Sequence, residues 1–267
     1  MFKHINRQKY HRVNNKYAVI IGIWAVFSIS GCYQSPQAPK LGIAPKKAVA
    51  PVPQHFAGIS VENRPVMYSV LGYGDDITFI IAGIHGDEPA GPYLANYLAD
   101  YLNRNPDLLI GRKVVILPAA NPDGLEYEKR FNVNKVDINR NFPSDNRIDS
   151  NDFGKSALSE PEAHIIYTLI QQYKPDRIVS IHQPYACIDY DGPAEALANQ
   201  MASYCDLPVE KVGALPGSLG SYAGVTLGIP IITFEMREND SNITTQLLWQ
   251  KYGKSLLAAI LYPNPVQ

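Results

Sequence analysis

Cysteine, charge and long hydrophobic runs are all scarce in this chain of 267 residues. Its three cysteines are too few for a small domain held together by disulfides. Charged residues make up 18% of the chain and the formal net charge is −1, which excludes a basic nucleic-acid-binding protein and a disordered acidic chain. The apolar run 18–30 is too short to cross a bilayer comfortably as a helix, which needs about 20 residues.

The N-terminus has the pattern of a secretory signal. Residues 1–16 carry five basic residues and no acid, and the short apolar run 18–30 follows them. The run ends in Ser30-Gly31-Cys32, which resembles the lipobox of bacterial lipoproteins. The resemblance implies a signal peptide over 1–31, lipidation of Cys32 and attachment to a membrane through that lipid. The alternative is an uncleaved anchor in which Cys32 is incidental.

Residue Tyr33 bears on the location, because it is not the Asp that usually retains such lipoproteins at the inner membrane. We therefore expect a cell-envelope protein anchored to the outer membrane and facing the periplasm. The segment 32–57 contains five prolines and no acid, which predicts an extended tether rather than a proline-rich ligand for a partner. All 25 acidic residues fall in the remaining domain, 58–267.

The domain alternates apolar runs with helical patterns. The apolar runs predict strands, and the last two end at His182 and Glu235; their ranges are 77–84, 113–119, 177–181 and 229–234. The first run opens into His85, and a turn is expected at 121–124. Helices are expected at 93–102, 162–173, 193–204, 220–227 and 243–261. This order predicts an α/β three-layer sandwich, in which helices flank a central mixed, largely parallel sheet.

Three of the strand ends carry side chains suited to metal chemistry. Ligands collect at the carboxyl ends of strands in such sheets, and His85, His182 and Glu235 occupy these ends. A catalytic zinc takes three protein ligands and keeps one position open. The pair His85 and Glu88, with His182, predicts one Zn²⁺ per chain. The alternatives are a chance His-x-x-Glu pair and a His182 satisfied by backbone hydrogen bonds.

Five ordered motifs carry a family resemblance that spans residues 65–262. They are Gly-Ile-His85-Gly-Asp-Glu88-Pro, Asn121-Pro-Asp-Gly124, Val-Asp-Ile-Asn139-Arg140-Asn-Phe-Pro143, Ser-Ile-His182 and Ile-Thr-Phe-Glu235. Their order resembles the zinc carboxypeptidases of the carboxypeptidase A superfamily. The short domain and the segments around His85 and His182 look most like the murein peptide amidases, which cut the γ-D-glutamyl–meso-diaminopimelate bond of peptidoglycan peptides.

The resemblance implies a role for each matching residue. His85, Glu88 and His182 would hold zinc, and Glu235 would be the general base, unless Glu235 only pairs with a nearby cation such as Arg237. Arg130 would stabilise the oxyanion together with zinc.

On the substrate side, Asn139 and Arg140 would grip the terminal carboxylate, a task that suits the planar guanidinium. Asp189 or Asp191 would receive the diaminopimelate amine, unless both only form a turn. Tyr222 is the candidate to lie over the substrate. A murein tripeptide or related peptide is the expected partner, and no nucleic acid is expected. Cys187 and Cys205 either pair or stay free.

Three other functions remain open at this point. The first is a metallocarboxypeptidase with another peptide specificity. The second is an N-acyl-amino-acid deacylase resembling the succinylglutamate desuccinylase and aspartoacylase branch, against which the export signal counts. The third is a non-catalytic wall-binding lipoprotein, which the intact set His85, Glu88, His182 and Glu235 disfavours.

Overall fold

The structure is a computed structural model that describes residues 49–266. The predicted signal peptide, Cys32 and most of the predicted tether therefore lie outside the described residues. The strands are β1 (His55–Ile59), β2 (Pro65–Gly72), β3 (Asp76–Ala82), β4 (Arg112–Leu117), β5 (Arg177–His182), β6 (Tyr185–Asp191) and β7 (Ile231–Arg237). The α-helices are α1 (Ala90–Arg104), α2 (Pro122–Tyr127), α3 (Pro161–Tyr173), α4 (Glu195–Ala202) and α5 (Thr245–Leu261). Three 3₁₀ helices are η1 (Pro106–Leu109), η2 (Ile138–Arg140) and η4 (Glu238–Asn242), and η3 (Gly220–Thr226) is a π-helix.

The strands form one seven-stranded sheet in the order β1-β2-β4-β3-β5-β7-β6. The four strands expected from the apolar runs are its core, and neighbours within β4-β3-β5-β7 run parallel. The outer strands β1, β2 and β6 pair antiparallel. The predicted sandwich with a mixed sheet is confirmed, and its parallel core brings the carboxyl ends of β3, β5 and β7 together at one edge.

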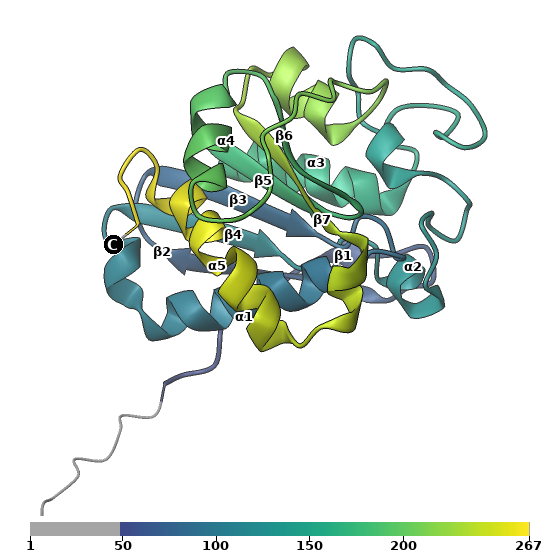
Figure 1. Cartoon of the computed structure of the whole chain (residues 1–267). Helices are drawn as coiled ribbons and strands as arrows, with labels where there is room; N and C mark the ends of the chain where they lie inside the picture. The colour runs from purple at the N-terminus through teal and green to yellow at the C-terminus, as the bar shows by residue number, and fades with distance from the viewer. Residues whose placement is uncertain (1–48, 267) are drawn as a thin grey trace, which may run out of the picture. The chain divides into compact units, whose positions relative to one another are not determined.

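Helices cover both faces of this sheet (Figure 1). Side chains alternate across β3, because Ile80 and Ala82 pack under α1, α4 and α5 while Phe79 and Ile81 pack under α3. Both faces are therefore buried, which explains why the core strands read as continuous apolar runs.

Three strands were missed from the sequence. Strand β1 has five residues and contains Gly58 at a bulge, and strand β2 mixes buried and partly exposed side chains. Strand β6 carries Asp189 and Asp191, residues that are normally depleted from strands. The turn read at Asp189 and Asp191 is thus wrong, because the segment pairs with β7. Strand β1 also starts at His55, so the folded domain begins before residue 58.

The Asn-Pro-Asp-Gly segment begins a helix instead of forming an isolated turn. Asn121 accepts a hydrogen bond from the Gly124 amide at 2.8 Å, which caps the N-terminus of α2. Pro122 occupies the first helical position, where a missing N–H costs nothing.

Two open questions are decided within residues 49–266. Cys187 and Cys205 are both free and form no disulfide. No helix in this range has the length and apolarity needed to cross a membrane.

Candidate metal centre and active-site cleft

The sheet itself places three of the expected site residues side by side. His85 lies three residues after the end of β3, His182 is the last residue of β5, and Glu235 lies in β7 opposite His182 in the parallel register. Glu88 precedes α1, whose N-terminus packs over the same edge. Residues separated by up to 150 positions in the sequence therefore meet in one place.

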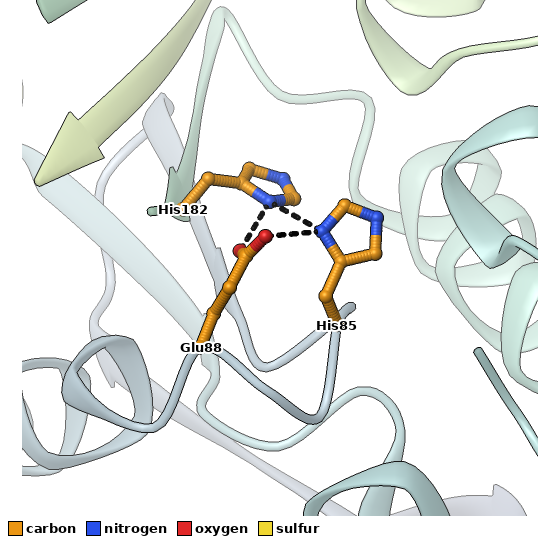
Figure 2. Close-up of side chains that lie close together, drawn as sticks. All are labelled: His85, Glu88 and His182. Carbon is orange, nitrogen blue, oxygen red and sulfur yellow. Dashed lines mark hydrogen bonds and ion pairs between the residues drawn. The ribbon is translucent and has the colours of Figure 1, made fainter. Parts of the chain in front are cut away.

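The side chains of His85, Glu88 and His182 converge on each other (Figure 2). The two oxygens of Glu88 divide between the rings, with Oε1 2.6 Å from His85 Nδ1 and Oε2 2.8 Å from His182 Nδ1. The two Nδ1 atoms are 3.2 Å apart. All three side chains are buried, and one donor atom from each lies within 4.8 Å of the others.

The electrostatics of this cluster favour a charged pair when no metal is bound. Burial opposes the charge on His85, but the hydrogen bonds that its ring donates to the Asp137 and Glu88 carboxylates outweigh this and raise the His85 pKa to about 9. Burial likewise opposes the Glu88 carboxylate, but His182 and His85 lower its pKa to about 2. The carboxylate is thus ready to act as a ligand, whereas His85 must give up a proton.

Two imidazole nitrogens and one carboxylate match the donor set of a catalytic zinc. The family described below implies zinc, and these residues fit it because their free donor atoms point to one common position. Within residues 49–266 this is the only cluster of three or more His, Cys, Asp or Glu that meets the geometry of a metal site.

Asp137 is a site residue that sequence reasoning missed. Its Oδ1 lies 3.1 Å from His85 Nε2, on the side of the ring away from Glu88. Such a carboxylate fixes the tautomer and orientation of a ligating histidine. Asp137 directly precedes Ile-Asn139-Arg140 in the quoted motif, so its position was visible, but no sequence signal linked it to His85.

The other histidine is oriented in a similar way. His182 Nε2 lies 2.9 Å from the hydroxyl of Ser180, two residues earlier on the same strand. The Gln183 amide donates to Glu88 Oε2 at 3.2 Å. Both Nε2 atoms are therefore occupied by protein groups, which leaves the two Nδ1 atoms as the donors toward a metal.

Arg130 lies at the same cluster, as the sequence indicated. Its guanidinium donates to Asp137 Oδ2 from Nη2 at 3.1 Å and lies 3.5 Å from Glu88 Oε1 through Nη1. The side chain is 38% exposed, so part of the guanidinium still faces the cleft that it lines.

Asn139 and Arg140 line the same cleft on the short turn η2. Asn139 Oδ1 accepts a hydrogen bond from the Leu219 amide at 2.9 Å, so the NH₂ end of this side chain is left for a ligand. Arg140 is half-buried, and burial lowers the pKa of its guanidinium. The backbone carbonyl of Arg140 is held by Arg147 at 2.6 Å, which fixes the turn.

Glu235 is buried beside the two histidines. Its Oε2 accepts a weak hydrogen bond of 3.4 Å from the Tyr185 amide, and it makes no ion pair with Arg237, which instead pairs with Asp206. Burial raises the pKa of Glu235. The alternative of a simple salt bridge is therefore wrong, and the carboxyl faces the cleft.

Asp189 and Asp191 both line the cleft because residues two apart in a strand share a face. Asp189 Oδ1 accepts a hydrogen bond from the Val212 amide at 2.8 Å. Asp191 is only 5% exposed, and its carboxylate has no hydrogen-bond or ion-pair partner among residues 49–266. Burial, reinforced by Asp189, raises the Asp191 pKa to about 6.

Tyr222 does not lie over the cleft, so its expected role as a substrate contact is wrong. The side chain is buried, and its hydroxyl accepts a hydrogen bond from Gln171 on α3. Its ring stacks on Phe142 with centroids 6.1 Å apart. The turn η3 directs this aromatic ring into the core under α3, while Gly220 at its start borders the cleft.

Comparisons with known proteins agree with this geometry. The sequence matches the model of the zinc carboxypeptidase family over residues 52–192, just over half of the chain. It is 31% identical to murein peptide amidase A of Escherichia coli (strain K12) over 211 residues, which covers 72% of this chain and 84% of that protein.

Solved structures share the fold. The crystal structure of a murein-tripeptide amidase from Escherichia coli O157 matches with a TM-score of 0.63 at 27% identity, covering 83% of this chain and 96% of that one. Carboxypeptidase A from Helicoverpa armigera matches with a TM-score of 0.65 over 79% of this chain and 69% of that one. At 19% identity the latter likeness concerns the fold alone.

Proposed function

This chain belongs to the zinc carboxypeptidase family of metallopeptidases, and on that premise we propose that it hydrolyses the γ-D-glutamyl–meso-diaminopimelate amide in peptidoglycan-derived peptides. Its similarity to proteins named murein peptide amidase supports this bond. Diaminopimelate is the C-terminal residue of a murein tripeptide, so an enzyme that grips a terminal carboxylate and cuts the preceding amide reaches this bond.

The observation that carries the proposal is the unpaired carboxylate of Asp191. The cleft offers anion-binding groups at Asn139 and Arg140 and an uncompensated anion at Asp191. A buried carboxylate without a partner is costly unless a ligand supplies a cation. Diaminopimelate carries both a terminal carboxylate and a side-chain amine, which matches the two kinds of group.

The surrounding backbone leaves room for the Asp191 carboxylate. A Cβ at Gly220 would lie 2.2 Å from Asp191 Oδ2, and a Cβ at Gly224 would lie 2.5 Å from Asp191 Cβ. Asp189 has a different task, because its hydrogen bond to the Val212 amide ties β6 to the segment that follows α4. Of the two aspartates, Asp191 is therefore the one we assign to the amine.

Each residue of the cleft has its own role in the proposed reaction. Asn139 and Arg140 orient the substrate through its carboxylate, and Arg130 faces the oxygen of the scissile carbonyl as its charge develops. Glu235 takes the proton of the attacking water and returns it to the leaving amine. Burial serves this role, because a raised pKa brings a carboxylate closer to the range where it can both accept and donate a proton.

His85, Glu88 and His182 would hold one zinc ion. When bound, zinc lowers the pKa of a water molecule to near neutrality and polarises the carbonyl. Asp137 and Ser180 keep the two imidazoles turned with Nδ1 toward that position.

The experiment incubates the domain with L-Ala-γ-D-Glu-meso-diaminopimelate and follows release of free diaminopimelate. We expect release by the wild type and a loss of about 10²–10⁴-fold in Glu235→Gln, the range typical of a general base. Asp191→Asn should raise KM about tenfold or more, since it removes a charged hydrogen-bond acceptor. The matched variant Asp189→Asn should raise KM less.

Two results would contradict the proposal. Cleavage of peptides ending in ordinary alanine, with no release of diaminopimelate, would indicate a carboxypeptidase of another specificity. Equal activity of Glu235→Gln and the wild type would remove Glu235 from the mechanism.

We also propose that the protein acts in the cell envelope, anchored through a lipid on Cys32 and facing the periplasm from the outer membrane. The support is the basic and apolar N-terminus with its Ser30-Gly31-Cys32 ending. Labelling cells with a radioactive fatty acid should mark the wild type but not Cys32→Ser. Separation of the two membranes then gives the location, and an unlabelled wild type would overturn the anchor while leaving the chemistry untouched.

A further inference from the structure

A second cavity lies directly behind the loop that carries Arg130. It measures about 500 Å³ and is formed between α2 and residues 129–135. Its walls are predominantly apolar, and the lining residues are Asp123, Gly124, Tyr127, Lys129, Phe131, Asn132, Val133 and Lys135. None of these residues has a part in the mechanism above.

This cavity adjoins the metal centre. Arg130 lines the cleft, while its two neighbours, Lys129 and Phe131, line the cavity. The amide of Gly86, next to the metal ligand His85, donates to the Lys129 carbonyl at 2.9 Å. A Cβ at Gly86 would collide with the Gly124 carbonyl, so the loop after β3 and the cavity wall are in direct contact.

Three apolar side chains in the cavity remain accessible to solvent. Tyr127 is 50% exposed, and Phe131 and Val133 are each 37% exposed. Tyr127 is held in place, because its hydroxyl donates to Glu62 at 2.8 Å and the guanidinium of Arg64 lies over its ring at 5.4 Å from the centroid. A fixed and exposed apolar surface beside a catalytic cleft is typical of a binding site.

Two lysine side chains line this cavity. Lys129 and Lys135 are exposed, and no carboxylate among residues 49–266 forms an ion pair with either. The one carboxylate in the lining, Asp123, is buried and already paired with Arg64 at 2.6 Å. The cavity thus favours a ligand that combines an apolar face with a negative charge.

The direction of the substrate indicates what reaches this place. In the proposed function Asn139 and Arg140 hold the leaving residue and Arg130 faces the scissile carbonyl, so the acyl part begins at Arg130, whose neighbours Lys129 and Phe131 line the cavity. In a γ-linked substrate the D-glutamyl residue keeps a free α-carboxylate next to the scissile carbonyl. Lys129 is the cation next to Arg130 in the sequence, and Tyr127 and Phe131 line the same cavity.

We propose that this cavity is a subsite for the sugar that peptidoglycan peptides carry at their N-terminus, with Lys129 receiving the α-carboxylate of the γ-D-glutamyl residue. The C–H groups of one face of a pyranose ring pack on Tyr127 and Phe131, which supply broad apolar surfaces. The inference rests on the proposed function and adds to it that the preferred substrate is a glycopeptide rather than a free peptide.

The test compares kcat/KM for L-Ala-γ-D-Glu-meso-diaminopimelate with that for the same peptide bearing N-acetylmuramic acid. We expect the ratio of glycopeptide to free peptide to be about fivefold or more in the wild type, which corresponds to roughly 1 kcal/mol of added binding. Phe131→Leu and Tyr127→Leu keep the apolar bulk but remove the ring, and each should bring the ratio close to one. The control Tyr93→Leu, at an exposed tyrosine of α1, should keep the wild-type ratio.

Three outcomes would overturn the subsite. They are a wild-type ratio at or below one, a ratio that both leucine variants leave unchanged, and an equal gain when an N-acetyl-leucyl group replaces the sugar, which would assign the cavity to a peptide. Melting curves identify any variant that fails to fold, and Phe131→Tyr then serves as the conservative replacement that should restore the ratio. Failure of the proposed function itself is distinct, because the wild type would then cleave neither substrate.

Discussion

Asp137 Oδ1 lies 3.1 Å from His85 Nε2, on the side of the imidazole opposite the nitrogen that faces Glu88. The second oxygen of the same carboxylate accepts a hydrogen bond from Arg130 at 3.1 Å. One buried side chain thus joins the candidate metal ligand His85 to Arg130, which lines the cleft. Burial opposes its charge, but His85 and then Arg130 lower the pKa of Asp137 well below its usual range, which favours the ionised carboxylate.

Replacing Asp137 by Asn should weaken metal binding. The amide keeps the shape but loses the charge that raises the basicity of His85, and loss of such a partner typically costs about 10–100-fold in metal affinity. Competition with a chelator measures the zinc affinity. The control Asp149→Asn removes an exposed carboxylate paired with Arg147 and should have wild-type affinity. Equal affinities in all three proteins would show that Asp137 does not support His85.

Zinc affinity should depend on pH because the metal competes with a proton. The pKa of His85 without metal is about 9, so at pH 7 the ring is protonated and must lose its proton to act as a ligand. The affinity should therefore rise about tenfold per pH unit between pH 6 and 8 and level off above pH 9. Chelator titrations at these values test this expectation. An affinity that does not change between pH 6 and 8 would mean that His85 is already neutral.

Arg130→Ala should lower kcat far more than it raises KM. In the proposed mechanism the guanidinium faces a charge that develops only during the reaction, and removing one such donor costs about 10²–10³-fold in kcat. Steady-state kinetics on the tripeptide give both constants. Arg104→Ala, at an exposed arginine of α1, is the control and should keep both values. A change confined to KM would make Arg130 a ground-state binding group instead.

Asp191→Asn should stabilise the protein while impairing its activity. The pKa of Asp191 is raised from 3.8 to about 6, so ionising this buried group disfavours the folded state. This cost is absent below pH 4, grows as the pH rises, and is complete above pH 6. Discounted for partial exposure to the cleft, the gain at pH 8 should be about 1–2 kcal/mol. Denaturant unfolding at pH 4 and pH 8 measures it, and a gain of the same size at both values would contradict the assignment to ionisation.

Tyr222→Phe should affect stability and leave the reaction unchanged. The hydroxyl accepts a partly buried hydrogen bond from Gln171 on α3, and its loss should cost about 1 kcal/mol of unfolding free energy. Because the ring lies under α3 and away from the cleft, KM and kcat should match the wild type. A raised KM would restore Tyr222 as a substrate contact.

The candidate metal ligands were predictable because their signals are local. His85 and Glu88 are three residues apart shortly after a buried strand, and His182 ends another such strand. Parallel core strands read as apolar runs, so their carboxyl ends can be located without the fold. Strand β6 gave no such signal, because its two aspartates face the cleft and make it look like a turn.

Other assignments depended on distant contacts. Asp189 and Asp191 were equivalent in the sequence, since residues two apart share a face of any strand. Only the position of the Val212 amide separates them. The hydrogen bond between Asp137 and His85 joins residues 52 positions apart, and no local sequence pattern indicates this contact. Tyr222 was misplaced because the sequence of a short turn does not determine whether a ring points to the cleft or to the core.

The sequence by itself determined the chemistry available to this protein: a zinc donor set, a candidate base and an arginine pair at the ends of apolar strands. The tertiary structure decided which of these groups are free to act. It gave Asp189 and Tyr222 partners within the protein, left Asp191 without a side-chain partner in the part of the chain that the structure describes, and tied Asp137 to His85. The physical reason is that hydrogen-bond satisfaction and burial depend on elements far away in the chain, and these set both the charge of a buried group and its freedom to bind a ligand.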